Sequence, residues 1–208
     1  MFLFKFYLIT DHANARHKPP QVLPQLAAAG LRALQVREKA LSPLGLADYA
    51  AQLVATLGER RAGLWLFLND RADIALSLRL DGTHLRNDSL PLERHAPVLR
   101  HALLYGVSTH SLAGVRSAEA AGADFVTFGP IYDTPSKAGY GEPVGLRALE
   151  RVARATSLPI FALGGVTPER TRACLDAGAH GVSAISAIWN ALHPVEALQA
   201  FHDALGSL

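Results

Sequence analysis

Residues 124–146 read DFVTFGPIYDTPSKAGYGEPVGL and contain the repeating unit from which the fold can be inferred. The apolar run Phe125–Phe128 is typical of a buried strand, and the run from about Val144 has a helical pattern. The long loop between them is rich in Gly, Pro, Ser and Thr and carries Lys137. Ile131, Tyr132 and two prolines argue against disorder, and a loop of this length inside a compact domain is then usually functional. A proline-rich surface turn is the plain alternative, but hydroxyls and a lysine beside glycines favour an anion-binding loop.

Short apolar runs alternate with longer amphipathic runs along the whole chain, without a linker or a low-complexity segment. Strands that alternate with helices form parallel sheets. We expect strands at Phe4–Ile9, Ala33–Val36, Leu64–Leu68, Leu80–Leu85, Leu103–Val107, Phe125–Phe128, Ile160–Leu163 and Gly181–Ile185. We expect helices at Gln21–Ala29, Pro43–Leu57, Arg71–Leu78, Pro91–Arg100, Leu112–Ala121, Leu146–Ala155, Pro168–Ala177 and Pro194–Leu205.

Eight such units predict an α/β fold of the TIM (β/α)8 barrel type, with residues 1–208 as a single domain. The chain is shorter than the roughly 250 residues typical of these barrels. A doubly wound open sheet is the main alternative. That fold places a GxGxxG turn after the first strand, where this sequence has Ile9-Thr10-Asp11-His12.

The composition excludes several functional classes. The chain has 208 residues, a formal charge of +2 and 18% charged residues, a balance that argues against nucleic acid as a partner. The 9 histidines are scattered and form no zinc-binding pattern. The single Cys174 excludes an intrachain disulfide and is expected to be buried. The apolar start of the chain looks like a strand and not a signal peptide, and no apolar run is long enough to span a membrane, so we expect a cytoplasmic protein.

Chemistry in such barrels sits on the loops that follow the strands. Three cations, Arg37, Lys39 and Lys137, lie at these positions, and a cluster of that kind suits an oligophosphate. Helix capping does not explain them, although it is a plausible role for Asp70 and Ser111. Two further segments, 164–166 and 185–187, each precede a helix at the common phosphate-binding position of the barrel. A second phosphate pocket implies two phosphorylated substrates or one long one.

With these residues identified, the sequence resembles the family of thiamine phosphate synthase and the TenI-type thiazole tautomerase. Single motifs are weak, but seven or more in order with matching spacings are specific, and they cover nearly the whole chain. The segments that carry the resemblance are 7–11 (YLITD), 35–39 (QVREK), 69–76 (NDRADIAL), 82–85 (GTHL), 106–111 (GVSTHS), 129–137 (GPIYDTPSK), 162–166 (ALGGV) and 186–188 (SAI).

The resemblance implies an enzyme of thiamine biosynthesis that couples hydroxymethylpyrimidine pyrophosphate to thiazole phosphate, or carboxythiazole phosphate, with release of pyrophosphate and Mg²⁺ as cofactor. It implies small phosphorylated substrates as partners, without nucleic acid or membrane, and leaves open whether the chain forms a homo-oligomer. Carried over by position, the pyrimidine pyrophosphate contacts are Gln35, Arg37, Lys39, Asn69 and Lys137, and Ser108 touches the pyrimidine. Asp70 corresponds to a Mg²⁺ ligand. Arg37, Lys39, Ser108 and Lys137 are the catalytic candidates, and the thiazole phosphate site comprises Thr134, Ser136, Gly165, Ile185 and Ser186.

One departure from the family pattern concerns the metal. The family synthase has a second Mg²⁺ aspartate just before a Leu-Pro pair, where this chain has Ser89, with Asp88 one place earlier. Asp133 is also more typical of tautomerases, whereas Pro130 replaces the tautomerase histidine and the Asn69-Asp70 pair survives. We favour the synthase. The alternative is a TenI-like thiazole tautomerase or a non-catalytic thiazole phosphate-binding protein, and a generic isomerase is a distant third.

Overall fold

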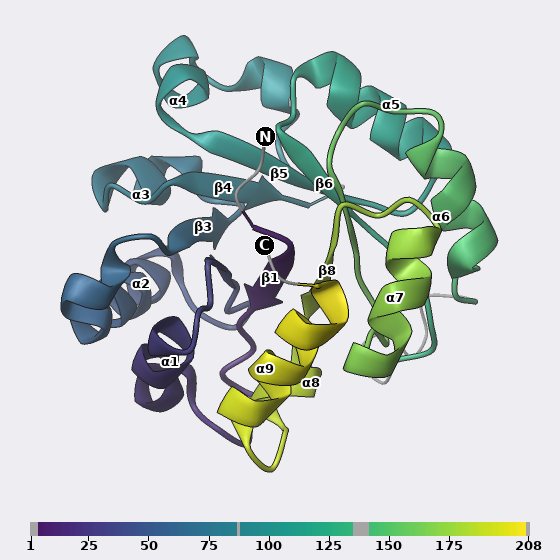
Figure 1. Cartoon of the computed structure of the whole chain (residues 1–208). Helices are drawn as coiled ribbons and strands as arrows, with labels where there is room; N and C mark the ends of the chain where they lie inside the picture. Colours follow the sequence, from purple (N-terminus) through teal and green to yellow (C-terminus); the bar gives the residue numbers. More distant parts are fainter. Residues whose placement is uncertain (1–3, 87, 135–141, 207–208) are drawn as a thin grey trace.

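The computed structural model describes residues 4–86, 88–134 and 142–206, and it forms a closed barrel of parallel strands (Figure 1). The strands follow one another around the barrel in chain order, and β1 pairs with β8 to close it. Their bounds are β1 Phe6–Ile9, β2 Ala33–Val36, β3 Trp65–Asn69, β4 Gly82–Leu85, β5 Leu104–Thr109, β6 Phe125–Phe128, β7 Ile160–Ala162 and β8 Gly181–Ala184. The predicted TIM barrel is therefore confirmed, and the open-sheet alternative is wrong.

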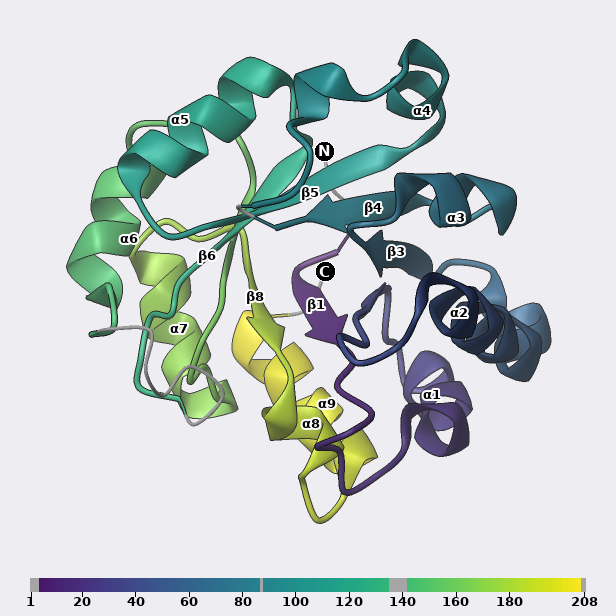
Figure 2. The same cartoon turned by 180° about the vertical axis from the view of Figure 1, so that it is seen from behind.

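Helices surround the barrel on its outer side, as both views show (Figures 1 and 2). They are α1 Pro19–Ala28, α2 Pro43–Leu57, α3 Ala72–Ser77, α4 Pro97–Ala102, α5 Leu112–Ala121, α6 Gly145–Ala153, α7 Pro168–Asp176, α8 Ser186–Trp189 and α9 Pro194–Leu205. The described part of the chain also contains the 3₁₀ turns η1 Gly58–Arg61 and η2 Leu92–Arg94. Five helices begin with a proline, whose fixed φ and missing N–H suit the first helical turn.

The predicted helix Pro91–Arg100 is wrong as a single element. The structure has the turn η2 and the short helix α4 there, separated by His95 and Ala96. Ala96 is extended at ψ 142°, because the residue before a proline is disfavoured in the helical region and Pro97 follows it. Smaller shifts occur at β1, which starts at Phe6, and at α1, which starts at Pro19.

An aromatic cluster fills the half of the barrel interior at the amino-terminal ends of the strands. Phe4, Tyr7, Phe67, Phe125 and Phe161 are almost completely buried and pack edge-on or stacked against one another. In three strands, the inward-facing position two residues further along the chain is polar. The pairs of residues are Phe67 and Asn69 in β3, Gly82 and His84 in β4, and Phe125 and Thr127 in β6. This change turns the carboxyl-terminal half of the interior into a polar site with an apolar floor.

Cys174 is free and buried in α7, as predicted. Burial raises the pKa of its thiol, which suits a packing role better than that of a nucleophile. Among the residues that the structure describes, no helix is long and apolar enough to cross a membrane.

Candidate active site

The carboxyl-terminal rim of the barrel brings together the predicted residues of β2 and β3. Gln35 is buried, and its side-chain Nε2 donates to Asn69 Oδ1 at 3.1 Å. The next residue on the same face, Arg37, lies just beyond β2, and its backbone N–H donates to Thr10 Oγ1 at 2.9 Å. The amide pair thus joins two strands below the rim, with the guanidinium of Arg37 one step above it.

Two of the predicted cations are close enough to repel one another, and a third joins them. The pKa of the Lys39 ammonium is lowered, first by the charge of Arg37, then by partial burial, and then by the charge of Arg86. Arg86 follows β4, so this cluster gathers cations from two loops of the rim. Arg86 was not among the three cations predicted to bind an oligophosphate, because its proximity to Lys39 depends on the curvature of the barrel. A concentration of positive charge of this kind favours a polyanion.

Glu38, between the two cations, faces the other way. Its carboxylate accepts the backbone N–H of His12, at 3.1 Å for Oε1 and 2.9 Å for Oε2. Burial raises the pKa of this carboxyl group. The ring of His12 in turn lies 3.1 Å from the Tyr49 hydroxyl of α2. These contacts fix the segment that carries Arg37 and Lys39 against the β1–α1 loop.

Asp70 directly follows β3 and has a left-handed backbone, with φ 68°. Its N–H donates to the carbonyl oxygen of His84 at 3.0 Å. The capping role is wrong, because the residue before α3 is Arg71 and no side chain caps that helix. A non-glycine residue in this region is uncommon and is often found at functional sites. A single carboxylate at the rim fits Mg²⁺, which commonly takes one or two carboxylates and completes its shell with substrate phosphates and water.

Asp88, the possible second metal ligand, is an ion-pair partner of Arg86. Arg86 Nε lies 2.8 Å from Asp88 Oδ1, and Arg86 Nη2 contacts Asp88 Oδ2. Ser89 turns back into its own loop, where its Oγ accepts the Arg86 backbone N–H at 2.7 Å. Within the described part of the chain, no group of three or more His, Cys, Asp or Glu side chains is placed to hold a metal. A metal here would therefore depend on Asp70 and on the substrate.

Ser108 lies at the carboxyl end of β5, above a buried histidine. His84 Nε2 is 3.1 Å from Ser108 Oγ and 3.4 Å from Thr127 Oγ1, and His84 Nδ1 is 3.3 Å from the Tyr7 hydroxyl. Burial and the charge of Arg37 lower the pKa of His84 to about 3, so the ring is neutral at pH 7. The sequence analysis quoted His84 within a motif but assigned it no role, although period-two alternation from Gly82 would have placed it inside the barrel.

The predicted thiazole phosphate residues come from the last three strands. Gly164 and Gly165 both have positive φ, 97° and 62°, and their turn packs on the β6–α6 loop. Backbone N–H groups of Ile131 and Tyr132 donate to Leu163 and Gly164 at 2.9 and 3.0 Å. This pairing sets Tyr132 and the carbonyl oxygen of Asp133 against Gly165, and Thr134 is the next residue along the chain. Ser136 and Lys137 lie outside the described residues, so their predicted roles stay predictions.

Arg170 of α7 connects the two loops. Its guanidinium carbon lies 4.5 Å from the centre of the Tyr132 ring, and its Nη1 donates to the carbonyl oxygen of Gly165 at 2.7 Å. Cation–π contacts of this kind contribute about 0.5–1 kcal/mol at exposed sites. The sequence analysis did not select Arg170, because nothing in its local pattern separates it from a solvated helix residue.

Ile185 and Ser186 border a pocket of about 370 Å³ between the β1–α1 loop and α8. Asp11, Asn14, Trp189 and Asn190 also line it. Because α8 is a single turn, its dipole is weak. The pocket places these two predicted residues beside open space.

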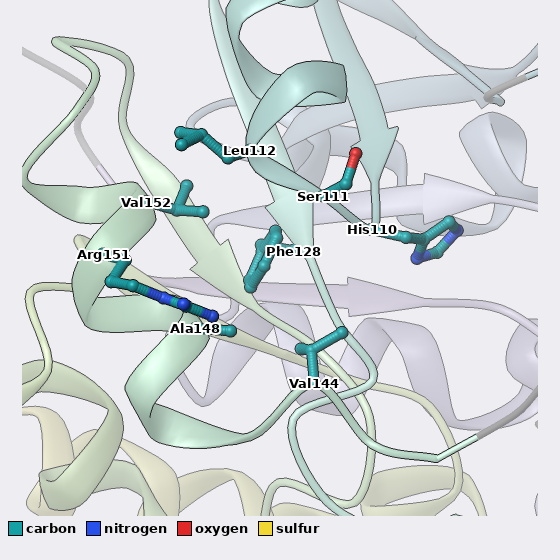
Figure 3. A pocket seen from close by; sticks show the side chains of 8 residues that line it. All are labelled: His110, Ser111, Leu112, Phe128, Val144, Ala148, Arg151 and Val152. Carbon is teal, nitrogen blue, oxygen red and sulfur yellow. The ribbon is translucent and has the colours of Figure 1, made fainter.

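A larger hollow of about 440 Å³ lies outside the barrel wall, between α5 and α6 (Figure 3). Its lining is mostly apolar, with Phe128 and Val152 among the walls and Arg151 and His110 as its charged or titratable members. None of the predicted site residues that the structure describes lines it. We therefore locate the candidate site by the polar residues at the barrel rim and not by the volume of a pocket.

The fold is a closed parallel α/β barrel whose rim carries a cluster of cations and a turn of two glycines. A model of the family described as thiamine monophosphate synthase matches residues 6–188. A Geobacter sulfurreducens protein named "Putative thiamine-phosphate synthase" is 42% identical over 186 residues, which cover 89% of this chain and 86% of that protein. The chain therefore belongs to the thiamine monophosphate synthase family.

Two further comparisons agree with this assignment. The "Thiamine-phosphate synthase" of Roseiflexus castenholzii is 34% identical over 204 residues, which cover 95% of this chain and 86% of that protein. The solved structure of a thiamine phosphate pyrophosphorylase from Pyrococcus furiosus superposes with a TM-score of 0.83 at 27% identity, over 97% of this chain and 95% of that one. The likeness thus extends over almost the whole barrel.

Proposed function

We propose that this protein is a thiamine phosphate synthase, which joins hydroxymethylpyrimidine pyrophosphate to a thiazole phosphate and releases pyrophosphate. The observation that supports the proposal is that a cation cluster and a glycine turn lie on the same rim. A cation cluster lies beyond β2 and β4, and a glycine turn lies beyond β7. Two phosphorylated substrates need two such sites, and family membership supports the particular pair.

The cationic site suits the pyrophosphate of the pyrimidine substrate. Carbon–oxygen cleavage leaves negative charge on the departing pyrophosphate, and charge that develops in a reaction is stabilised best by groups already in place. Arg37 and Lys39 lie where they can hold it, and Arg86 adds a third cation. Lys137 belongs to the same proposal by its position in the sequence. Cleavage leaves cationic character on the pyrimidine methylene, which the ring and its amino group can delocalise.

The glycine-lined site suits the phosphate of the thiazole substrate. Backbone N–H groups at Gly165, Ile185 and Ser186 bind a phosphate without a side chain that would fill the space. Thr134 supplies a hydroxyl from the adjacent loop. The thiazole nitrogen then attacks the methylene carbon, so that the protein need not supply a nucleophile, and most of the catalysis is positioning.

We propose Asp70 as the carboxylate that holds Mg²⁺. The ion, when bound, neutralises pyrophosphate charge. The left-handed backbone of Asp70 and its place beside Asn69 support this role. Asp88 is a weaker candidate, because its carboxylate is already engaged by Arg86. That the protein works in the cytoplasm stays a prediction, and whether it forms a homo-oligomer stays open.

The decisive experiment is incubation of the purified protein with both phosphorylated substrates and Mg²⁺, with thiamine phosphate and pyrophosphate measured by chromatography. We expect equal amounts of the two products, and none when either substrate is withheld. A parallel assay follows isomerisation of the carboxythiazole phosphate in EDTA. Isomerisation that persists there, without thiamine phosphate at saturating Mg²⁺, would contradict the proposal in favour of a thiazole tautomerase.

A further inference from the structure

Below Ser108, a chain of hydrogen bonds runs down into the barrel through His84 to Tyr7. The Tyr7 hydroxyl lies 3.3 Å from His84 Nδ1, and His84 Nε2 lies 3.1 Å from Ser108 Oγ. Tyr7 and His84 are 0% and 1% exposed, so water does not compete for these contacts. The direction in which the protons point along this chain decides whether Ser108 donates or accepts at the barrel mouth.

The surroundings of Tyr7 settle that direction. Its ring packs against Phe4, Phe67, Phe125 and Phe161, with centroid distances between 5.4 and 6.0 Å. These side chains have no hydrogen-bond acceptor. Ser183 lies opposite Tyr7 in the β1–β8 register. The Oγ of Ser183 is buried and has no hydrogen-bond partner within the described chain, so it does not accept from Tyr7. His84 Nδ1 is therefore the acceptor that remains for the phenolic proton.

Tyr7 keeps that proton at all ordinary pH values, because burial raises its pKa well above the usual value. With Nδ1 accepting from Tyr7, the neutral imidazole carries its hydrogen on Nε2. The Nε2–H then donates to Ser108 Oγ, and Thr127 Oγ1, at 3.4 Å, is a weaker second acceptor of the same hydrogen. The opposite tautomer would bury the Tyr7 hydroxyl hydrogen without an acceptor, which native structures avoid.

We propose that Tyr7 and His84 are positioning residues that make Ser108 a hydrogen-bond donor toward the barrel mouth. With its oxygen already accepting from His84, the Ser108 hydroxyl directs its own hydrogen to a ligand acceptor, such as a ring nitrogen of an aminopyrimidine. The identity of that ligand rests on the proposed function. The tautomer and the direction of the chain do not.

The first test is ¹⁵N NMR of the histidine rings in the whole protein at neutral pH, without ligand. We expect His84 to show a protonated Nε2 and an unprotonated Nδ1. Tyr7→Phe removes the donor to Nδ1 and should change this pattern or broaden it by exchange between tautomers. A proton on Nδ1 in the wild-type protein would overturn the inference, whatever the enzyme catalyses.

The second test is kinetic and uses a double-mutant cycle. His84→Leu should lower kcat by about 10–100-fold, because loss of orientation at the reacting centre has effects of that order. His84→Gln keeps an amide N–H near the position of Nε2 and should recover most of the loss. In a Ser108→Ala background, His84→Leu should have almost no further effect, because it acts through that hydroxyl. Additive losses would contradict the positioning role.

The chain offers a matched control for the loss of a buried tyrosine–histidine bond. The Tyr105 hydroxyl lies 3.1 Å from His95 Nδ1, and both residues are buried. Tyr105→Phe removes a hydrogen bond of the same kind, but none of the described contacts link it to Ser108. We expect Tyr7→Phe and Tyr105→Phe to have similar effects on the melting temperature, and only Tyr7→Phe to lower kcat. Equal losses of kcat would indicate a merely structural role for Tyr7.

Discussion

Asp88 and Arg86 form a two-point ion pair within the β4–α4 loop, with Arg86 Nε 2.8 Å from Asp88 Oδ1. This ion pair engages the carboxylate of Asp88. Asp88 is the residue next to Ser89, which stands at the position of the second Mg²⁺ aspartate in the family pattern. The carboxylate of Asp88 also neutralises part of the positive charge that Arg86 adds to the cation cluster. For this reason the proposal assigns the metal to Asp70 and not to Asp88.

The first prediction follows from that relationship. Asp70→Asn should abolish Mg²⁺-dependent synthesis of thiamine phosphate, whereas Asp88→Asn should change the half-saturating Mg²⁺ concentration little. Ser89→Asp should lower that concentration, because it restores a carboxylate at the position that the family synthase uses. The measurement is initial rate against free Mg²⁺ for the four proteins.

Stability provides the control for these variants. The side chains of Arg86 and Asp88 are 45% and 69% exposed, and solvent screening makes exposed ion pairs contribute little to stability. Asp88→Asn should therefore leave the melting temperature almost unchanged. If Asp88→Asn abolished synthesis and Asp70→Asn did not, the assignment of the metal ligand would be reversed.

The second prediction concerns pH and Lys39. In the free protein, the charge of Arg37 first, then burial and then Arg86 lower the pKa of Lys39 below its ordinary value of 10.5. A bound pyrophosphate would offset the repulsion and raise this pKa again. Binding is then strongest while Lys39 is protonated, and it weakens as the pH rises through the lowered pKa of the free protein. Calorimetry with inorganic pyrophosphate at alkaline pH should detect proton uptake on binding.

Lys39→Arg separates this effect from the titration of pyrophosphate itself. Arginine stays protonated throughout the accessible range, so the variant should lose the part of the proton uptake that belongs to Lys39. The same uptake in both proteins, measured in two buffers of different ionisation enthalpy, would show that Lys39 does not sense the anion.

The course of the chain could be predicted largely from sequence, because hydrophobic periodicity and glycine or proline boundaries are local signals. The residues that follow strands, such as Arg37 and Gly165, could be placed on one rim for the same reason. The break before Pro97 was readable in principle, since a proline restricts the residue before it. The missed residues depend on distant contacts. Tyr7 and His84 meet inside the barrel although 77 residues separate them, and no local pattern reports that.

The third prediction tests the contact of Arg170 with the two anion-site loops. Arg170→Met keeps most of the aliphatic stem but removes the cation above Tyr132 and the hydrogen bond to Gly165. Losing a cation–π contact and one hydrogen bond together costs about 1–2 kcal/mol. Because these contacts hold the loops in both the free and the bound protein, only part of this free energy affects binding, and the KM for the thiazole phosphate should rise by at most about tenfold. The KM for the pyrimidine substrate should stay nearly the same.

Arg172→Met on the same helix is the matched control. Its side chain is 78% exposed and forms an i,i+4 ion pair with Asp176. It should leave both KM values unchanged. Equal effects of the two variants on the thiazole phosphate KM would point to net charge as the cause and not to the Arg170 contacts.

The last prediction concerns the glycine turn itself. A Cβ added at Gly165 would lie 2.4 Å from the carbonyl oxygen of Asp133 and 2.8 Å from Tyr132 Cβ, and φ there is +62°. Gly58 has a similar φ of +53°, but a Cβ there meets nothing within 4 Å. Gly58→Ala therefore meets no neighbouring atom and carries only the backbone strain of φ +53° with ψ −129°, a conformation that L side chains rarely adopt. Gly165→Ala adds a clash with backbone, which only a movement of the loop can relieve.

We expect Gly165→Ala to lower the melting temperature more than Gly58→Ala and to raise the thiazole phosphate KM more than tenfold, with Gly58→Ala leaving that KM unchanged. A Gly165→Ala enzyme with normal KM would mean that the phosphate does not bind at this turn.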